Sequence, residues 1–254
     1  MVIVLSPAKK MRSDVKSANL KPSQPMFQEK ALPLVNKLSR FSKPKLMKLM
    51  SISENLAKLN LDRYDTFSET GENEASEIAI HAFNGDVFLG LESDTLTAPQ
   101  LAYANKHLRI LSGLYGYLRP SDEIQPYRLE MGSSLKIGRK KNLYEYWQTD
   151  IASAIQEDLN QTKSDVIINL ASKEYFKAVD TDALNAQVIT IHFREYRDGK
   201  LKAIQFNLKR ARGLLARFII VNKIKEIEHI KGFDTDNYVF EAEMSSDHDW
   251  YFVR

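Results

Sequence analysis

The chain has 254 residues, enough for one large domain or two modest ones that each bury a full hydrophobic core. It contains no cysteine, which excludes disulfides, thiolate catalysis, iron–sulfur clusters and cysteine-ligated zinc. Its net charge of +3 is too small to indicate nucleic-acid binding by itself, and its 43% hydrophobic and 27% charged residues are typical of a soluble protein.

The sequence contains no segment that predicts contact with a membrane. No stretch approaches the roughly 18 consecutive apolar residues that a spanning helix needs. Met1–Leu5 is too short for a signal peptide. We therefore expect a cytoplasmic protein.

The apolar pattern predicts both strands and helices, and no linker divides residues 1–254 into separate domains. Met1–Leu5 is short and β-branched, which predicts a buried strand. In the first half, helices are then expected over Phe27–Ser39, Lys45–Met50, Ser53–Leu59, Glu74–Phe83 and Pro99–Leu111, with a short strand over Asp86–Leu89.

The second half begins with a long amphipathic helix over Leu143–Leu159, in which Trp147 has a core spacing. A helix from Asn207 to about Lys225 is expected near the end of the chain. The strands expected around it are Asp165–Leu170, a hairpin of Gln187–Phe193 with Lys200–Phe206 around Asp198-Gly199, and Tyr238–Glu243 with Trp250–Val253.

A basic stretch from Lys30 to Ser53 holds six lysines and arginines and no acidic residue. Such a stretch is often a solvated face, and it can also bind nucleic acid. Two short helices joined by Met50-Ser-Ile-Ser53 match a helix-hairpin-helix pattern within residues 44–64, although the turn lacks glycine. Lys43, Lys45 and Lys48 are therefore candidate DNA contacts.

The segment Leu111–Gly132 combines three glycines and two prolines with polar residues and has no amphipathic period. Its turns present Arg119, Tyr127, Arg128 and Glu130 from a constrained loop. The two arginines either pair with Asp122 and Glu130 to hold the loop together, or bind a phosphate or carboxylate with their planar fork.

Residues at predicted strand ends form a second group of candidates, because α/β proteins place ligands there. Ser6, Pro7 and Lys9 follow the first strand. Asn169, Ser172, Glu174 and Tyr175 follow the Asp165–Leu170 strand, where free amides can meet an anion, although Ser172 can equally cap a helix.

The helix that starts at Asn207 supplies a third group. Arg210 and Arg217 are seven residues apart and lie on one face, with Gly213 between them opening a groove that a phosphate could approach. Arg212 points elsewhere and is a candidate for a buried ion pair. If the three groups converge, they form a basic cleft for a DNA backbone or a nucleotide. Glu130 and Glu174 would be candidate acid–base groups, and Tyr127 a stacking or proton-relay group.

No motif predicts a metal or a cofactor. The five histidines share no ligand spacing. A phosphate-binding loop, a dinucleotide-binding glycine motif and a nucleophile elbow are all absent from the sequence.

Five segments together resemble the bacterial peroxide stress protein YaaA family, and the likeness runs from Met1 almost to the C-terminus. They occur in the same order as in that family: Ser6–Lys9, Phe83–Leu91, Leu111–Gly132, Ile168–Phe176 and Ala211–Ile219.

The resemblance implies a cytosolic protein that protects against hydrogen peroxide, is linked to lower intracellular free iron, and binds DNA without sequence readout. It also implies an unusual single-domain α/β fold over residues 1–254, with a mixed sheet surrounded by helices and a helix-hairpin-helix element. The first hypothesis is accordingly a non-enzymatic protein that binds duplex or distorted DNA through a basic cleft. The alternative is an enzyme acting on a nucleobase or nucleotide in the same cleft. A third hypothesis, in which the protein limits iron by contacting other proteins, leaves no trace in the sequence.

Overall fold

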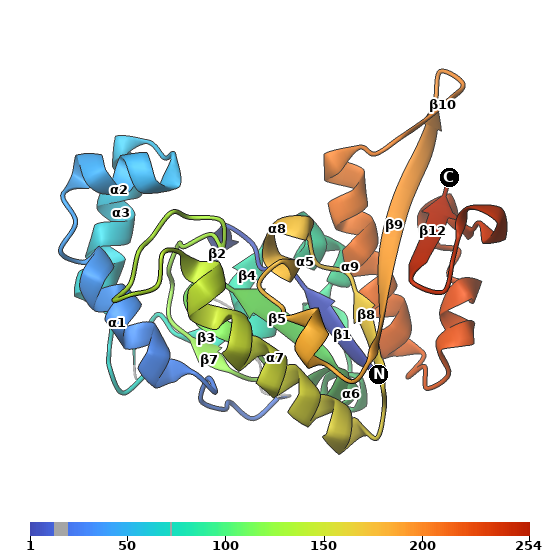
Figure 1. The fold of residues 1–254 in the computed structure, drawn as a ribbon, viewed down its shortest axis with the longest axis horizontal. Coiled ribbons are helices and arrows are strands. Elements are labelled where there is room, and N and C mark those ends of the chain that lie inside the picture. The colour runs from blue at the N-terminus through green and yellow to red at the C-terminus, as the bar shows by residue number, and fades with distance from the viewer. Residues whose placement is uncertain (13–19, 72) are drawn as a thin grey trace.

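A mixed sheet forms the centre of the computed structural model, which describes residues 1–12, 20–71 and 73–254 (Figure 1). Strand β1 (Val2–Leu5) lies in the middle and is completely buried, as expected of a parallel strand covered on both faces. The sheet order is β11 (Val239–Phe240), β12 (Asp249–Val253), β9 (Gln187–Arg197), β8 (Val166–Asn169), β1, β5 (Leu108–Ser112) and β6 (Gly116–Leu118), with β10 (Lys200–Lys202) paired to β9.

The strands around β1 run parallel, and those at the two edges run antiparallel. Strands β5, β1, β8, β9 and β12 form the parallel part, whereas β6, β10 and β11 pair antiparallel with their neighbours. The expected α/β fold with a mixed sheet is therefore confirmed. Two small sheets lie apart from it, β2 (Lys10–Met11) with β4 (Phe83–Asn84) and β3 (Glu77–Ile78) with β7 (Glu123–Ile124).

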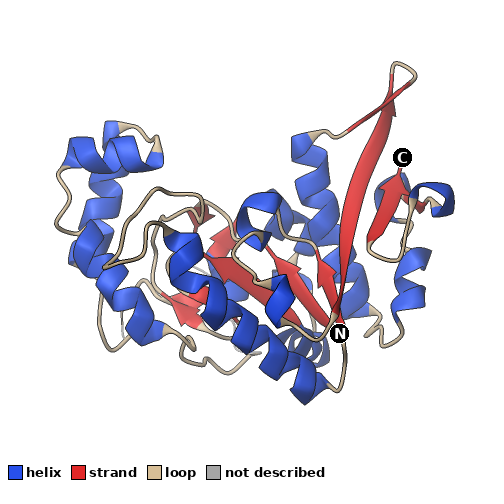
Figure 2. Ribbon diagram, in the orientation of Figure 1, coloured by secondary structure: helices blue, strands red, loops and turns tan. Residues whose placement is uncertain are grey.

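Helices cover both faces of the sheet (Figure 2). The long α7 crosses one face, and α5 and α9 pack against each other on the other side (Figure 1). No helix of the described ranges is long and apolar enough to cross a membrane. The helices are α1 (Gln28–Leu38), α2 (Lys43–Met50), α3 (Glu54–Asp65), α4 (Ala79–Ala82), α5 (Asp86–Leu91), α6 (Ala98–His107), α7 (Leu143–Thr162), α8 (Lys173–Phe176) and α9 (Gln205–Val221), with 3₁₀ turns at Ser93–Thr95, Thr181–Ala183, Ile227–Gly232, Thr235–Asn237 and Ala242–Met244.

Most predicted elements of the second half are confirmed within a few residues. Asn142 starts α7 because its side chain accepts a hydrogen bond from the Glu145 amide at 2.9 Å. Trp147 is fully buried in the core, where its indole N–H donates to the Gly113 carbonyl at 3.0 Å. The hairpin forms around Asp198 and Gly199, both with positive φ.

Three predictions in the first half are wrong. The expected strand Asp86–Leu89 is helix α5, since Val87, Phe88 and Leu91 make one buried face. The expected helix Pro99–Leu111 ends at His107, and Leu108–Ser112 is strand β5 beside β1. The expected helix Glu74–Phe83 is mostly strand β3 and the single turn α4. In each case the pairing partner lies far away in the sequence, and contacts with it override the local pattern.

Helices α2 and α3 occupy the position of the expected helix-hairpin-helix element. Pro44 lies in the first turn of α2, and Ser51 ends that helix with a left-handed backbone, φ 51°. Ser53 then caps α3 by accepting a hydrogen bond from the Leu56 amide at 3.4 Å. That this helix pair is a DNA-binding helix-hairpin-helix stays a prediction.

A buried ion pair ties β5 to α7 across the core. The Arg109 guanidinium forms two hydrogen bonds with the Asp158 carboxylate, at 2.6 and 2.7 Å, and both side chains are less than a tenth exposed. Tyr117 donates a third bond to the same carboxylate at 2.7 Å. The pair gives Arg109, inside an otherwise apolar strand, the counter-charge that burial requires.

Candidate functional site

The loops that follow β1, β5 and β8 meet at one edge of the sheet, because parallel strands place their carboxyl ends side by side. Ser6 accepts a hydrogen bond from the Ser172 amide at 2.8 Å, and the two hydroxyls lie 3.3 Å apart. Pro7 is in the same loop as Ser6. Asn169 accepts from the Ala171 amide at 3.0 Å and so shapes the turn before Ser172. The structure thus brings the expected pocket residues into two touching loops.

Glu130 is the centre of charge at this edge. Its carboxylate lies 3.2 Å from Lys9 Nζ and accepts from Arg128 at 2.9 and 3.2 Å. Glu130 and Arg128 have side chains only 14% and 15% exposed, whereas Lys9 is 67% exposed. The Arg128 guanidinium is therefore paired with the Glu130 carboxylate. This is the first of the two alternatives stated from the sequence, in which the arginine holds the loop together.

Glu174, the second candidate carboxylate, holds the end of the same loop. It lies in α8, whose first amides are capped by Ser172, and it accepts a hydrogen bond from the Gly132 amide at 3.0 Å. A Cβ on Gly132 would lie 3.0 Å from the Glu174 carboxylate, so glycine permits this close approach. The loop segment Glu130–Gly132 is thus tied to Lys9, after β1, through Glu130, and to Glu174, after β8, through the Gly132 amide.

Tyr127 and Tyr175 are buried beneath these carboxylates. The Tyr127 hydroxyl lies 2.6 Å from Ser112 Oγ, and its ring packs edge-on against Tyr115 with a centroid distance of 5.5 Å. Burial raises the pKa of both tyrosines well above the ordinary value, so both phenols stay protonated at neutral pH. Tyr127 is only 4% exposed and offers no free face on which a base could stack.

We call the set of residues at this edge the carboxyl-edge cluster. It consists of Ser6, Pro7, Lys9, Ser112, Tyr127, Arg128, Glu130, Asn169, Ser172, Glu174 and Tyr175. Ser112 was not predicted as a member, because the strand that ends there was expected to be helix.

Arg119 lies in the same segment, Leu111–Gly132, but its contacts are outside the carboxyl-edge cluster. Its guanidinium bonds the buried Asp122 carboxylate at 2.9 Å and the Gln24 carbonyl at 2.8 Å. Burial raises the pKa of Asp122, partly offset by its hydrogen bonds with Arg119 and Ser23. These contacts fasten the segment 20–25 to the loop, so Arg119 has a structural task.

The arginines of α9 differ sharply from one another. The groove expected beside Gly213 is filled, because a Cβ at Gly213 would lie 1.8 Å from the Val87 carbonyl oxygen of α5. Arg217 donates to the Leu91 and Glu92 carbonyls at 3.1 and 3.0 Å. Arg210 is exposed, and Arg212 is partly buried.

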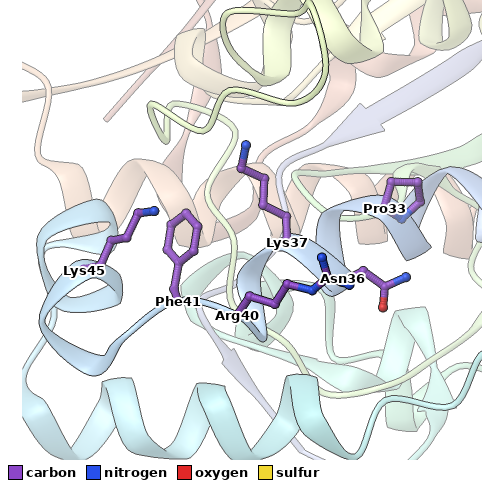
Figure 3. A pocket seen from close by; sticks show the side chains of 6 residues that line it. All are labelled: Pro33, Asn36, Lys37, Arg40, Phe41 and Lys45. Atoms are coloured by element: carbon purple, nitrogen blue, oxygen red, sulfur yellow. The ribbon is translucent and has the colours of Figure 1, made fainter.

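A shallow hollow between α1 and α2 gathers cations of the basic stretch. Its volume is about 320 Å³, and Figure 3 shows the side chains around it. Lys45 Nζ lies 3.8 Å from the centroid of the Phe41 ring, which is a cation–π contact. The residues that line this α1–α2 hollow are Pro33, Asn36, Lys37, Arg40, Phe41 and Lys45.

Ion pairing divides the nine predicted phosphate-binding cations into two groups. Lys9, Lys43, Arg119, Arg128 and Arg217 each have a carboxylate within 4.0 Å; for Lys43 it is Glu54, at 2.7 Å. The remaining four, Lys45, Lys48, Arg210 and Arg212, have no acidic partner among residues 1–12, 20–71 and 73–254. Lys37 and Arg40, which were not singled out from the sequence, are likewise unpaired there. Both lie within the basic stretch Lys30–Ser53, and the absence of acidic residues from that stretch is the sequence pattern that could have identified them.

No arrangement for a metal ion is found in the described part of the chain, where no three histidine or acidic side chains gather in a suitable group.

Comparisons with known proteins agree with the resemblance noted from the five segments. The family model described as peroxide stress protein YaaA matches residues 1–244. A UPF0246 protein of Saccharophagus degradans is 43% identical over 254 residues, covering 100% of this chain and 99% of that protein. UPF0246 proteins of Bordetella pertussis and Rhizorhabdus wittichii are each 46% identical, with 97% and 100% of this chain and 96% and 99% of theirs covered.

Proposed function

Because the chain belongs to the peroxide stress protein YaaA family, we propose that it protects cells against hydrogen peroxide by binding DNA, with the α1–α2 hollow as the main contact. The ligand is the phosphate backbone of duplex or distorted DNA, contacted without base readout. Lower intracellular free iron, which the family resemblance implies, is part of the same proposal and would be measured separately in cells with and without the protein.

The observation that supports this proposal is the unpaired positive charge around the α1–α2 hollow. Lys37, Arg40 and Lys45 line the hollow, and none of them has a carboxylate partner in the described ranges (Figure 3). Lys48 on α2 is a fourth cation without an acidic partner in the described ranges. Cations that are not neutralised within the protein attract phosphates and release the counterions condensed on DNA.

The turn between α2 and α3 argues that side chains, rather than backbone amides, make these contacts. The amides of Ser51 and Ile52 both donate to the Met47 carbonyl, the latter at 3.2 Å. They are therefore not free to meet a phosphate. The missing glycine in the turn is consistent with this, and the DNA affinity should depend on Lys37, Arg40 and Lys45.

Fluorescence anisotropy with a labelled duplex tests the proposal. We expect the triple variant Lys37→Glu/Arg40→Glu/Lys45→Glu to lose at least about tenfold in affinity at low salt, since each cation adds to the phosphate attraction. Lys225→Glu reverses an exposed lysine beyond α9 that has no acidic partner in the described ranges, and it should bind like wild type. Thermal melting checks that both variants are folded, because exposed charge changes cost under about 0.5 kcal/mol. Wild-type affinity in the triple variant would refute the hollow as the contact.

The carboxyl-edge cluster supports a second candidate function, catalysis on a nucleobase or nucleotide. The specific observation is that Glu174, after β8, holds the Gly132 amide of the loop that carries Glu130, which pairs with Lys9 and Arg128. Such strand ends are the usual place for ligands in α/β proteins. Base release or deamination measured on nucleotides would be lost in Glu130→Gln if this function were present, while DNA affinity would persist.

A further inference from the structure

Arg212 differs from the exposed unpaired arginines because it is partly buried and still has no partner in the described ranges. Its Nε is buried without a hydrogen-bond partner. No carboxylate lies within 4.0 Å of it among residues 1–12, 20–71 and 73–254, and it donates no hydrogen bond there. Buried guanidinium groups in proteins are normally paired, since removing a charge from water is costly. Arg109 shows the usual solution in this same chain.

The surroundings of Arg212 increase this cost. Burial first, and then the charge of Arg194 on β9, lower the pKa of Arg212 to about 10. Arg194 gives its own hydrogen bond to the Phe193 carbonyl and lies over the Tyr251 ring. The neighbouring acid on β9, Glu195, is already held by Arg197 and Arg254 at 3.2 and 3.1 Å. Two guanidinium groups thus lie close enough to repel each other, and neither is paired with a carboxylate of the described ranges.

We propose that Arg212, assisted by Arg194, binds a phosphate group of a nucleic-acid strand between α9 and β9. The fixed fork of a guanidinium matches phosphate oxygens, and a phosphate would supply both the hydrogen bonds and the counter-charge that Arg212 lacks. This inference rests on the proposed DNA binding for the identity of its ligand, and it adds a second contact distinct from the α1–α2 hollow.

The β9–β10 hairpin beyond this site indicates that the ligand is a nucleic-acid strand rather than free phosphate. Strands β9 and β10 project from the body of the molecule, at the opposite end from α2 (Figure 1). Tyr196 on the hairpin and Phe206 at the start of α9 are 63% and 59% exposed. Lys200 and Lys209 nearby have no acidic partner in the described ranges. Exposed aromatic rings beside free cations are the elements that single-stranded nucleic acid uses for stacking and backbone contact.

Stability and binding of Arg212→Met test the site together. If Arg212 awaits an anion, methionine removes an uncompensated charge, so the variant should melt at a higher temperature than wild type without ligand. Inorganic phosphate, a mononucleotide and a single-stranded oligonucleotide should each raise the melting temperature of wild type, and this rise should be lost in the variant. Arg217→Met is the stability control on the same helix, and it should melt lower because Arg217 has carbonyl partners.

Tyr196→Ala separates the sources of the phosphate. It should weaken oligonucleotide binding severalfold and leave the shift by inorganic phosphate unchanged; an unchanged oligonucleotide affinity would overturn the assignment of a strand. The site itself would be overturned if the Arg212→Met variant melted at a lower temperature than wild type, like Arg217→Met, and if phosphate still raised its melting temperature. Wild type that binds no DNA at all would refute the proposed function, whereas a phosphate shift lost in Arg212→Met would still support the anion site.

Discussion

Gly213→Ala should destabilise the protein, because α5 and α9 cross at a pair of glycines. An added Cβ would lie 1.8 Å from the Val87 carbonyl oxygen and 2.8 Å from the Leu91 nitrogen, both backbone atoms that cannot rotate away. Gly90 meets the Arg210 carbonyl at 2.2 Å in the same way. Overpacking costs about 1–3 kcal/mol, and the upper value applies here since whole helices must separate. Alanine returns about 1 kcal/mol of helix propensity, so the net loss is about 2 kcal/mol.

Thermal and urea unfolding measure this loss. For a protein of this size, about 2 kcal/mol corresponds to a melting temperature lower by roughly 4–8 °C. Gly232→Ala is the matched control, because a Cβ there has no atom within 4 Å and φ is not positive. Its unfolding free energy should change by less than about 0.5 kcal/mol. A Gly213→Ala protein as stable as wild type would refute the close helix crossing.

Two further predictions concern buried charge. Asp158→Asn should cost about 3–5 kcal/mol in urea unfolding, because Arg109 would keep its charge without a counter-charge; a loss under about 1 kcal/mol would contradict this reasoning. Burial lowers the pKa of His81, so the folded state resists the proton that the unfolded state takes up near pH 6.5. Stability should therefore fall as pH drops from about 7.5 to about 5.5, and less so in His81→Gln; equal pH slopes for the two proteins would exclude His81 as a cause.

Local patterns were sufficient for elements whose signals lie within the segment itself. The β-branched run before Pro7 predicted β1, and Asp198-Gly199 predicted the hairpin of β9 and β10. Strand β5 was missed because no glycine or proline separates it from α6, and its extended form depends on pairing with β1. Helix α5 was missed because its buried face packs mainly against α9, which lies far away in the sequence.

The candidate site shows the same limit for charges. Sequence position placed Ser6, Asn169 and Ser172 at strand ends, and the parallel strands then brought them together. Sequence position did not predict which cations form ion pairs, because partners such as Lys9 and Glu130 lie in loops that are far apart in the sequence. Arg212 was expected to find a buried partner and has none in the described ranges.

The salt dependence of DNA affinity tests the central claim most directly. A protein that contacts Z phosphates loses affinity with a slope of about −0.9Z in log affinity against log salt. We predict a steep slope for wild type, and a slope shallower by about 0.9 for each of Lys37, Arg40 and Lys45 replaced by glutamine. A slope near zero for wild type, or an unchanged slope in the triple glutamine variant, would contradict backbone binding at the α1–α2 hollow.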